Sequence, residues 1–209
     1  TLRAASAAAT GWPYIAPTKH IQEKDGIDTF AKHIDLCLRD LSGTPEEFRG
    51  TPAEIVEADC RRSPFGSESF DFAFTSPPYL NNYDYGDRTR LESYFTQFVK
   101  TWSDITEKVR DHLIVSATTQ ISRTDYETRD ILSDDLKQAE PKLAKELQGK
   151  VDLLSQRRLV KGGKKSYDIM VGQYFNDMTL SIADTFRLLK PRSKHVLILG
   201  DSAPVRHST

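Results

Sequence analysis

Apolar residues recur along the chain at spacings that predict helices between short strands. Helical spacing marks residues 28–41, 91–112 and 167–189. Ser42-Gly43 is expected to end the first of these helices, and the aromatic stripe of the second is expected to lie in the core. Residues 125–156 are more polar but carry leucines at helical intervals. We expect two helices there, since a proline interrupts the pattern.

Three short segments have the composition of strands, namely residues 53–59, 70–75 and 195–202. The second is an apolar, aromatic-rich run and is expected to be buried. It ends in Thr75-Ser76-Pro77-Pro78-Tyr79. Proline fixes φ and supplies no N–H, so the carbonyl groups of this corner do not continue a strand ladder. Ligands of open α/β sheets bind at the carboxyl ends of the strands, so the corner is a candidate site.

The groups of this corner suit a reaction at an exocyclic amine of a nucleobase. The lone pair of such an amine is delocalised into the ring, which makes the nitrogen a poor nucleophile. Ser76 Oγ and the Pro77 carbonyl could each accept one N–H bond and hold the nitrogen in line with a methyl donor. Tyr79 could stack on a base extruded from the duplex, and its ring face would favour a nearby sulfonium.

The same residues resemble motif IV of the amino-methyltransferases, which use S-adenosylmethionine to methylate N4 of cytosine or N6 of adenine in DNA. The family form is an acidic residue, Asn or Ser, followed by Pro-Pro and an aromatic residue. A Ser after Thr is most typical of N4-cytosine enzymes, so N6-adenine is the second choice. The resemblance implies direct methyl transfer, base flipping and a role in restriction–modification or another form of DNA protection. The residues it implies as catalytic are Ser76, Pro77, Pro78 and Tyr79.

Two weaker segments follow in the family order. A strand ending at Asp59 resembles motif III, and Leu-Lys-Pro before an apolar strand resembles the later part of the core, although Arg192-Ser193 stand where two glycines are usual. The resemblance implies an α/β, Rossmann-like methyltransferase core. It also implies cofactor contacts from Asp59, Thr75 and Ser76. A helix or turn cap is the alternative role for Asp59.

A Rossmann-like methyltransferase needs a glycine-rich turn after its first strand, because glycines let the backbone come close to the cofactor. The sequence contains no such turn. Gly162-Gly163 has no strand before it, so it does not qualify. We therefore expect an incomplete core at residues 53–119 and 167–209, interrupted by a helical, basic insertion at 120–166 that helps to recognise the target. Residues 1–52 would link this core to an upstream segment that carries the turn. A permuted order or a separate chain would also supply the turn.

Two groups of residues are candidates for DNA contacts. After the corner, Tyr83 and Tyr85 could stack on bases, and Arg88 and Arg90 could bind phosphates. The second group is the strongest local basic cluster, around a Gly-Gly tip that suits a strand-clamping loop. It contains Arg157, Arg158, Lys161, Lys164 and Lys165. A solvated charged loop is the alternative for both groups.

Composition sets wider bounds. The 209 residues are 38% hydrophobic and 28% charged, which suits one soluble globular domain. The formal net charge is -1, so any DNA contact must come from local patches. Cys37 and Cys60 have no metal or disulfide spacing, and neither lies in a C5-methyltransferase nucleophile motif; Cys37 is expected in a core helix. We expect a cytoplasmic protein with no metal and no membrane span.

Two other functions remain open. The same corner could serve a methyltransferase that acts on RNA or on another amine. The chain could also be a non-catalytic nucleic-acid-binding subunit with a degenerate methyltransferase fold. Comparing methyl uptake by DNA with methyl uptake by RNA would distinguish the first alternative from a DNA methyltransferase. Absence of S-adenosylmethionine binding, even with any partner chain present, would favour the second.

Overall fold

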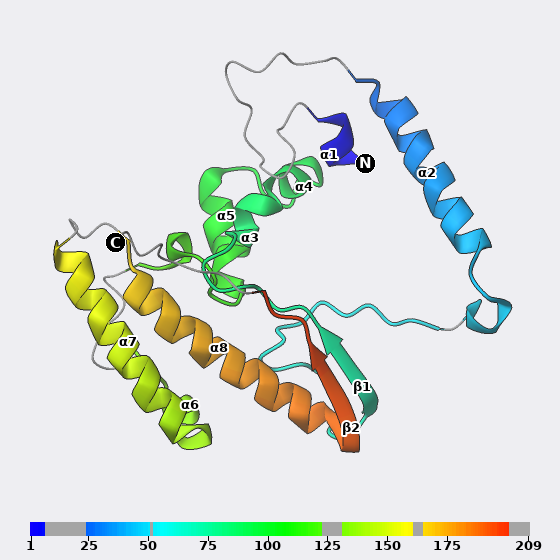
Figure 1. The fold of residues 1–209 in the computed structure, drawn as a ribbon. Coiled ribbons are helices and arrows are strands. Elements are labelled where there is room, and N and C mark those ends of the chain that lie inside the picture. The colour runs from blue at the N-terminus through cyan, green and yellow to red at the C-terminus, as the bar shows by residue number, and fades with distance from the viewer. Residues whose placement is uncertain (7–23, 51, 123–130, 161–164, 201–209) are drawn as a thin grey trace, which may run out of the picture. The chain divides into compact units, whose positions relative to one another are not determined.

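The computed structural model describes residues 1–6, 24–50, 52–122, 131–160 and 165–200, and combines helices with one sheet (Figure 1). It falls into two units: Thr1–Glu57 with Gly86–Ile105, and Ala58–Tyr85 with Thr106–Thr209. The elements are α1 Leu2–Ala5, α2 Gly26–Ser42, η1 Glu46–Phe48, β1 Phe70–Thr75, α3 Tyr85–Arg88, α4 Arg90–Phe95, α5 Trp102–Lys108, η2 Arg110–His112, η3 Thr118–Gln120, α6 Asp134–Ala139, α7 Pro141–Val160, α8 Tyr167–Leu188 and β2 Leu189–Leu197. The mixture of helix and parallel sheet agrees with the expected α/β class.

Helix α2 of the first unit confirms the first predicted helix. The carboxylate of Asp25 accepts hydrogen bonds from the backbone N–H groups of Ile27 and Asp28, and Gly43 caps the other end, as expected. None of its residues is buried. The placement of Cys37 in a core helix is therefore wrong, since its side chain is exposed.

The predicted helix over 91–112 is divided in the structure. Its first part, α4, ends before Gln97, which has a φ of 60° in the left-handed region. The segment after it leads to the separate elements α5 and η2. The aromatic stripe is exposed rather than in the core, at 68% for Phe95 and 53% for Trp102, whereas Val99 is buried. The change of backbone direction at Gln97 therefore breaks the helical register on which the stripe depended.

In the second unit, β1 and β2 form a parallel pair in which Phe72 lies opposite Lys194 and Thr75 opposite Leu197. Helix α8 leads directly into β2 and lies alongside the sheet (Figure 1). The predicted strand at 70–75 is confirmed. The strand predicted at 195–202 begins earlier, at Leu189, and ends at Leu197; residues 201 and 202 lie outside the described residues. The strand expected at 53–59 is wrong. Those residues have no regular structure and are exposed, because no described strand pairs with them.

The two faces of this sheet differ in burial. Side chains alternate between faces, and in β1 Ala73 and Thr75 are partly shielded. The other face carries Phe72 at 53%, Phe74 at 60% and Val196 at 39% exposure. The expectation that β1 is a buried strand is therefore wrong for this face, within the described part of the chain.

The core of the second unit lies where α6, α7 and α8 meet. Pro141 opens α7, which confirms the predicted break between two helices. The buried cluster contains Ile131, Leu132, Leu136, Ala144, Leu147, Val151, Ile169, Met170 and Val171. Among the helices of the described ranges, none is long and apolar enough to cross a membrane.

The pairing of β2 with β1 contains an irregular step. The pairing moves from Phe70 opposite Leu189 to Phe72 opposite Lys194, so β2 contains extra residues there. Arg192, within this bulge, has a φ of 69°. A side chain is unfavourable in the left-handed region, by about 1–2 kcal/mol, whereas glycine is not.

Arg192→Gly is therefore expected to raise the free energy of unfolding by roughly 0.5–1 kcal/mol, because relief of the strain exceeds the entropic cost of a glycine. Urea denaturation measures the change. Lys194→Gly is the matched control: it lies in the regularly paired part of β2 and is expected to lower stability. A loss of stability in Arg192→Gly equal to that of the control would contradict the prediction.

Candidate active site

The candidate corner begins where β1 ends. The backbone N–H of Ile198 donates to the Thr75 carbonyl over 2.9 Å, so the ladder extends to this residue. The Thr75 hydroxyl lies 3.1 Å from His195 Nε2. Beyond this point the chain turns away from the sheet, and Ser76 is exposed. The predicted location at the carboxyl end of a parallel strand is therefore the observed one.

The two proposed acceptors belong to an exposed residue, Ser76, and a partly exposed one, Pro77. Ser76 Oγ lies 3.2 Å from Tyr79 Oη. Within the described residues, this is the hydroxyl's hydrogen-bonding neighbour, and no donor reaches the Pro77 carbonyl. Whether these two oxygens accept N–H bonds from a ligand stays a prediction of the sequence.

Neighbouring segments hold the corner in place. Tyr174 of α8 donates its hydroxyl to the Pro78 carbonyl over 3.1 Å. Burial, and then the nearby Tyr85, raise the pKa of Tyr174 above its ordinary value of 10.0, so the hydroxyl keeps its proton at neutral pH. Asn81 adopts a φ of 57° and donates its N–H to the Ser116 carbonyl over 2.8 Å. A rigid corner of this kind holds its acceptors in one orientation.

The predicted stacking residues Tyr83 and Tyr85 contact each other. Their rings are 6.4 Å apart and nearly perpendicular, at 86°. The Tyr83 carbonyl accepts a bond from the Ser116 hydroxyl over 3.1 Å, which ties this segment to the one that holds the corner. The two rings are half-buried, so they are more packed than an open stacking platform would be.

The predicted phosphate contacts, Arg88 and Arg90, belong to the first unit. The carbonyl of Arg88 accepts a hydrogen bond from Arg3. The guanidinium of Arg90 lies over the Trp102 ring at 5.3 Å. The guanidinium of Arg90 therefore has a local aromatic neighbour, whereas the bond at Arg88 involves its backbone alone.

The basic cluster is described in part. Lys161 and Lys164 lie outside the described residues. Arg157 is exposed at the end of α7, while Arg158 lies 3.8 Å from the buried carboxylate of Asp168. Lys165 lies over the Tyr167 ring at 5.9 Å. Arg157 and Lys165 are thus exposed cations near the predicted tip.

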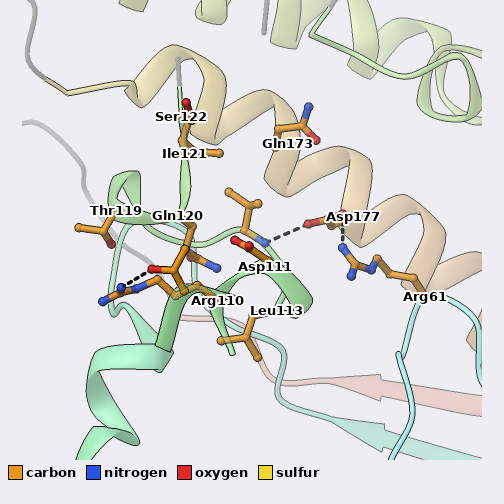
Figure 2. Close-up of a pocket in the computed structure, with 12 residues that line it drawn as sticks. Arg61, Arg110, Asp111, Leu113, Thr119, Gln120, Ile121, Ser122, Gln173 and Asp177 are labelled. Atoms are coloured by element: carbon orange, nitrogen blue, oxygen red, sulfur yellow. Dashed lines mark hydrogen bonds and ion pairs between the residues drawn. The ribbon is translucent and has the colours of Figure 1, made fainter. Parts of the chain in front are cut away.

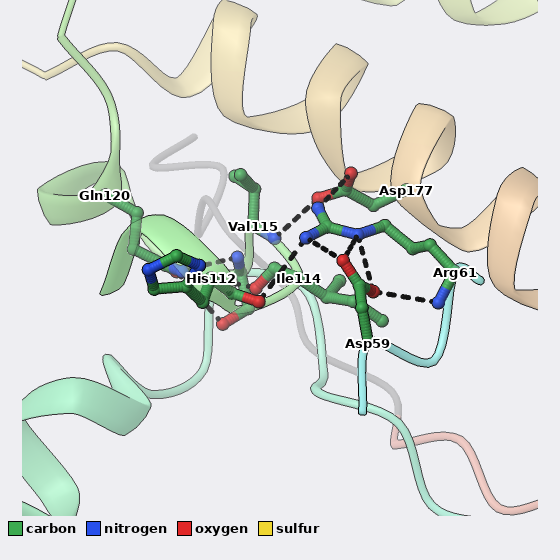
Figure 3. Close-up of polar contacts among 8 residues, drawn as sticks. Asp59, Arg61, His112, Ile114, Val115, Gln120 and Asp177 are labelled. Atoms are coloured by element: carbon green, nitrogen blue, oxygen red, sulfur yellow. Dashed lines mark hydrogen bonds and ion pairs between the residues drawn. The ribbon is translucent and has the colours of Figure 1, made fainter. Parts of the chain in front are cut away.

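Asp59 belongs to a charged cluster with Arg61 and Asp177 (Figure 3). Arg61 donates to Asp59 from Nε over 2.9 Å and from Nη2 over 2.8 Å, and from Nη1 to Asp177 over 2.9 Å. The second oxygen of Asp177 accepts the Val115 N–H over 2.9 Å. The backbone N–H of Arg61 also donates to Asp59 over 2.9 Å, which is the turn cap weighed as its alternative role. Asp59 therefore has partners of its own in this structure.

Sequence reasoning missed Arg61 and Asp177 as a pair. They are 116 residues apart, so spacing carries no signal. The available signal was the position of Asp177 beside Met178 on a largely apolar helix, since a buried carboxylate requires a partner.

Asp59→Asn is expected to weaken the acid dependence of stability. Hydrogen bonds from Arg61 hold the pKa of Asp59 below its ordinary value of 3.8, although burial acts in the opposite direction. A carboxylate with a lowered folded pKa contributes stability that is present above its unfolded pKa and lost as the pH falls through the folded pKa. The Asn variant should therefore lose less free energy of unfolding between about pH 5 and pH 2. Urea titrations across this range measure the slope, and an unchanged slope would contradict the expectation.

A polar cavity lies beside the charged cluster (Figure 2). Its volume is about 560 Å³, within the range that holds a small ligand. Arg61 and Asp177 line it, together with Arg110, which donates to Asp84 over 2.8 Å. The other lining residues are Thr106, Asp111, Leu113, Val115, Thr119, Gln120, Ile121, Ser122 and Gln173. The corner residues do not line it, so the cavity and the corner are separate features of this unit.

A scan against protein-family models, a search of curated proteins and a search of solved structures each found no match to this chain. The resemblance to a methyltransferase family therefore stays an expectation from the motif residues of the sequence.

Proposed function

We propose that this chain belongs to a cytoplasmic DNA amino-methyltransferase that uses S-adenosylmethionine, and that it is the part of the enzyme that binds the target amine. The observation that carries the proposal is the place of two acceptors, Ser76 Oγ and the Pro77 carbonyl, directly after the carboxyl end of a parallel strand. N4 of cytosine is the favoured target and N6 of adenine the second. The reason for this order is the serine that follows Thr75.

The arrangement of β1, α8 and β2 supports a Rossmann-like core. Two parallel neighbours require a crossover, and here a long helix completes it. In such sheets ligands bind at the carboxyl ends of the strands, where the corner lies. Arg192, which is left-handed within the bulge of β2, stands at one of the two positions where the family usually has glycine.

The chain's own residues would act on the amine. Ser76 Oγ and the Pro77 carbonyl would each accept one N–H bond, which orients the nitrogen lone pair and favours its pyramidal form. Tyr79 would stack on the extruded base and keep water from one face of it. S-adenosylmethionine would supply the methyl group.

The described residues fit the amine better than the cofactor. Asp59, the expected adenine contact, is paired with Arg61, and the Thr75 hydroxyl is next to His195. The sequence contains no glycine-rich turn after a strand. The cofactor would therefore be held mainly by a further segment or a second chain.

The exposed face of the sheet and its edge, which is unpaired within the described residues, are evidence for such a further segment or second chain. In doubly wound α/β folds both faces of the sheet are covered. Here Phe72, Phe74 and Val196 are exposed, and in the described ranges β1 has β2 as its one neighbour. Further strands beside β1 and a covering helix would complete a sheet with a cofactor site.

The test is methyl transfer by the full-length protein with any chain that copurifies with it. Tritiated S-adenosylmethionine is offered with unmethylated genomic DNA or with total RNA. We expect label in DNA, recovered after hydrolysis as N4-methylcytosine. Label in RNA alone would favour the RNA methyltransferase. Failure to bind S-adenosylmethionine in calorimetry, with the partner present, would favour the non-catalytic subunit.

A further inference from the structure

Gly200 lies against the ring of Tyr79. A Cβ added at Gly200 would be 2.6 Å from Cδ2 and 2.7 Å from Cε2 of this ring. Real Cβ contacts are essentially never that short. Gly200 is not among the residues of positive φ, so its backbone does not require a glycine. The need at this position is space for the tyrosine.

Gly200 is tied to the same end of the sheet as the corner. The segment that carries it leaves β2, and its first residue, Ile198, donates to the Thr75 carbonyl over 2.9 Å. Gly200 follows two residues later. The ring of Tyr79 is thus restrained on its Cδ2–Cε2 side by Gly200 and at its hydroxyl by Ser76, 3.2 Å away.

The backbone of the corner is restrained independently of the ring. Tyr174 donates to the Pro78 carbonyl, and the N–H of Asn82 donates to the Tyr79 carbonyl over 3.2 Å. The backbone therefore stays in place when the ring is displaced. A side chain at Gly200 would thus move mainly the ring of Tyr79 and not the backbone that carries it.

We propose that Gly200 is a positioning residue for Tyr79: its missing side chain sets the place of the ring that stacks on the target base. This inference rests on the proposed function and adds to it a residue outside the motif. A displaced ring would hold the base, and with it the amine, away from the acceptors. Errors of about 1 Å in such positions can reduce a rate about 100-fold.

The contact is tested by ¹⁹F NMR on protein labelled with 3-fluorotyrosine. The Tyr79 resonance is assigned as the one lost in Tyr79→Phe. We expect Gly200→Ala to shift this resonance. Gly149→Ala is the matched control, because a Cβ there meets nothing within 4 Å, and it should leave the resonance in place. An unmoved Tyr79 resonance in Gly200→Ala would overturn the inference whatever the activity.

The role is tested by methyl transfer to genomic DNA. Gly200→Ala should lower kcat about 10–100-fold and leave KM for S-adenosylmethionine within about twofold. Gly200→Ala combined with Tyr79→Ala should be no slower than Tyr79→Ala alone, since Gly200 acts through that ring. Normal kcat in Gly200→Ala beside an active unsubstituted protein would overturn the positioning role alone. Absence of transfer by the unsubstituted protein would overturn the proposed function, and this role with it.

Discussion

Ser76→Ala is expected to lower the rate of methyl transfer about 100-fold or more while the protein stays folded. Loss of one preorganised hydrogen-bonding group at a reacting centre costs about 10²–10³ in rate. Ser76 is exposed and its hydroxyl neighbours Tyr79 Oη, so alanine leaves no buried polar group unsatisfied. Tritium transfer to DNA measures the rate, and circular dichroism with urea denaturation measures the fold.

Two further variants make this prediction specific. Ser42→Ala is the control, because that exposed hydroxyl bonds the Arg39 carbonyl at the end of α2, in the other unit. It should transfer methyl normally. Tyr79→Ala should also reduce transfer strongly, whereas Tyr79→Phe, which keeps the ring, should retain more activity. Near-normal transfer in both Ser76→Ala and Tyr79→Ala would rule out the corner as the reacting centre.

Elements with a strong local signal could be predicted from the sequence. The strand over 70–75 has the predicted bounds, because a run of aromatic and small residues is stopped by two prolines. Helix α8 also agrees to within one residue, and the break at Pro141 follows from the missing N–H of proline. In each case a few adjacent residues determine the backbone.

Burial could not be predicted in the same way. A periodic pattern shows which residues share a face, but whether that face is covered depends on segments distant in the chain. The stripe of α2 is exposed, as are Phe95 and Trp102, which were expected in the core. The strand expected at 53–59 did not form for a related reason, since a strand needs a neighbour to pair with.

In the candidate site, too, local features could be predicted and contacts between distant segments could not. Ser76 to Tyr79 are consecutive, so their chemistry could be inferred from the sequence. The contacts that hold them are not local: Tyr174 reaches Pro78 across 96 residues. Arg61 and Asp177 are separated even further, and the closeness of Gly200 to Tyr79 follows from the pairing of β1 with β2.

Asp177→Ala is expected to lower the free energy of unfolding by about 3 kcal/mol. Asp177 is 8% exposed, and its carboxylate accepts from Arg61 over 2.9 Å and from the Val115 N–H over 2.9 Å. Alanine would leave the N–H unsatisfied and remove one of the two carboxylates that neutralise Arg61, so the cost exceeds that of the lost hydrogen bonds alone. Urea denaturation of the folded protein measures the change.

Two further variants distinguish loss of the contacts within the charged cluster from the general effect of removing an aspartate. Asp152→Ala, at an exposed position of α7 where the carboxylate accepts a bond from Gln148, is the control and should change stability by less than about 0.5 kcal/mol. Arg61→Met with Asp177→Ala should recover part of the loss, because the pair is then removed together and no partly buried guanidinium has lost one of its two carboxylates. If the double variant instead shows the sum of the two single losses, Arg61 and Asp177 are not coupled, and the cluster does not connect the segment at Asp59 to α8.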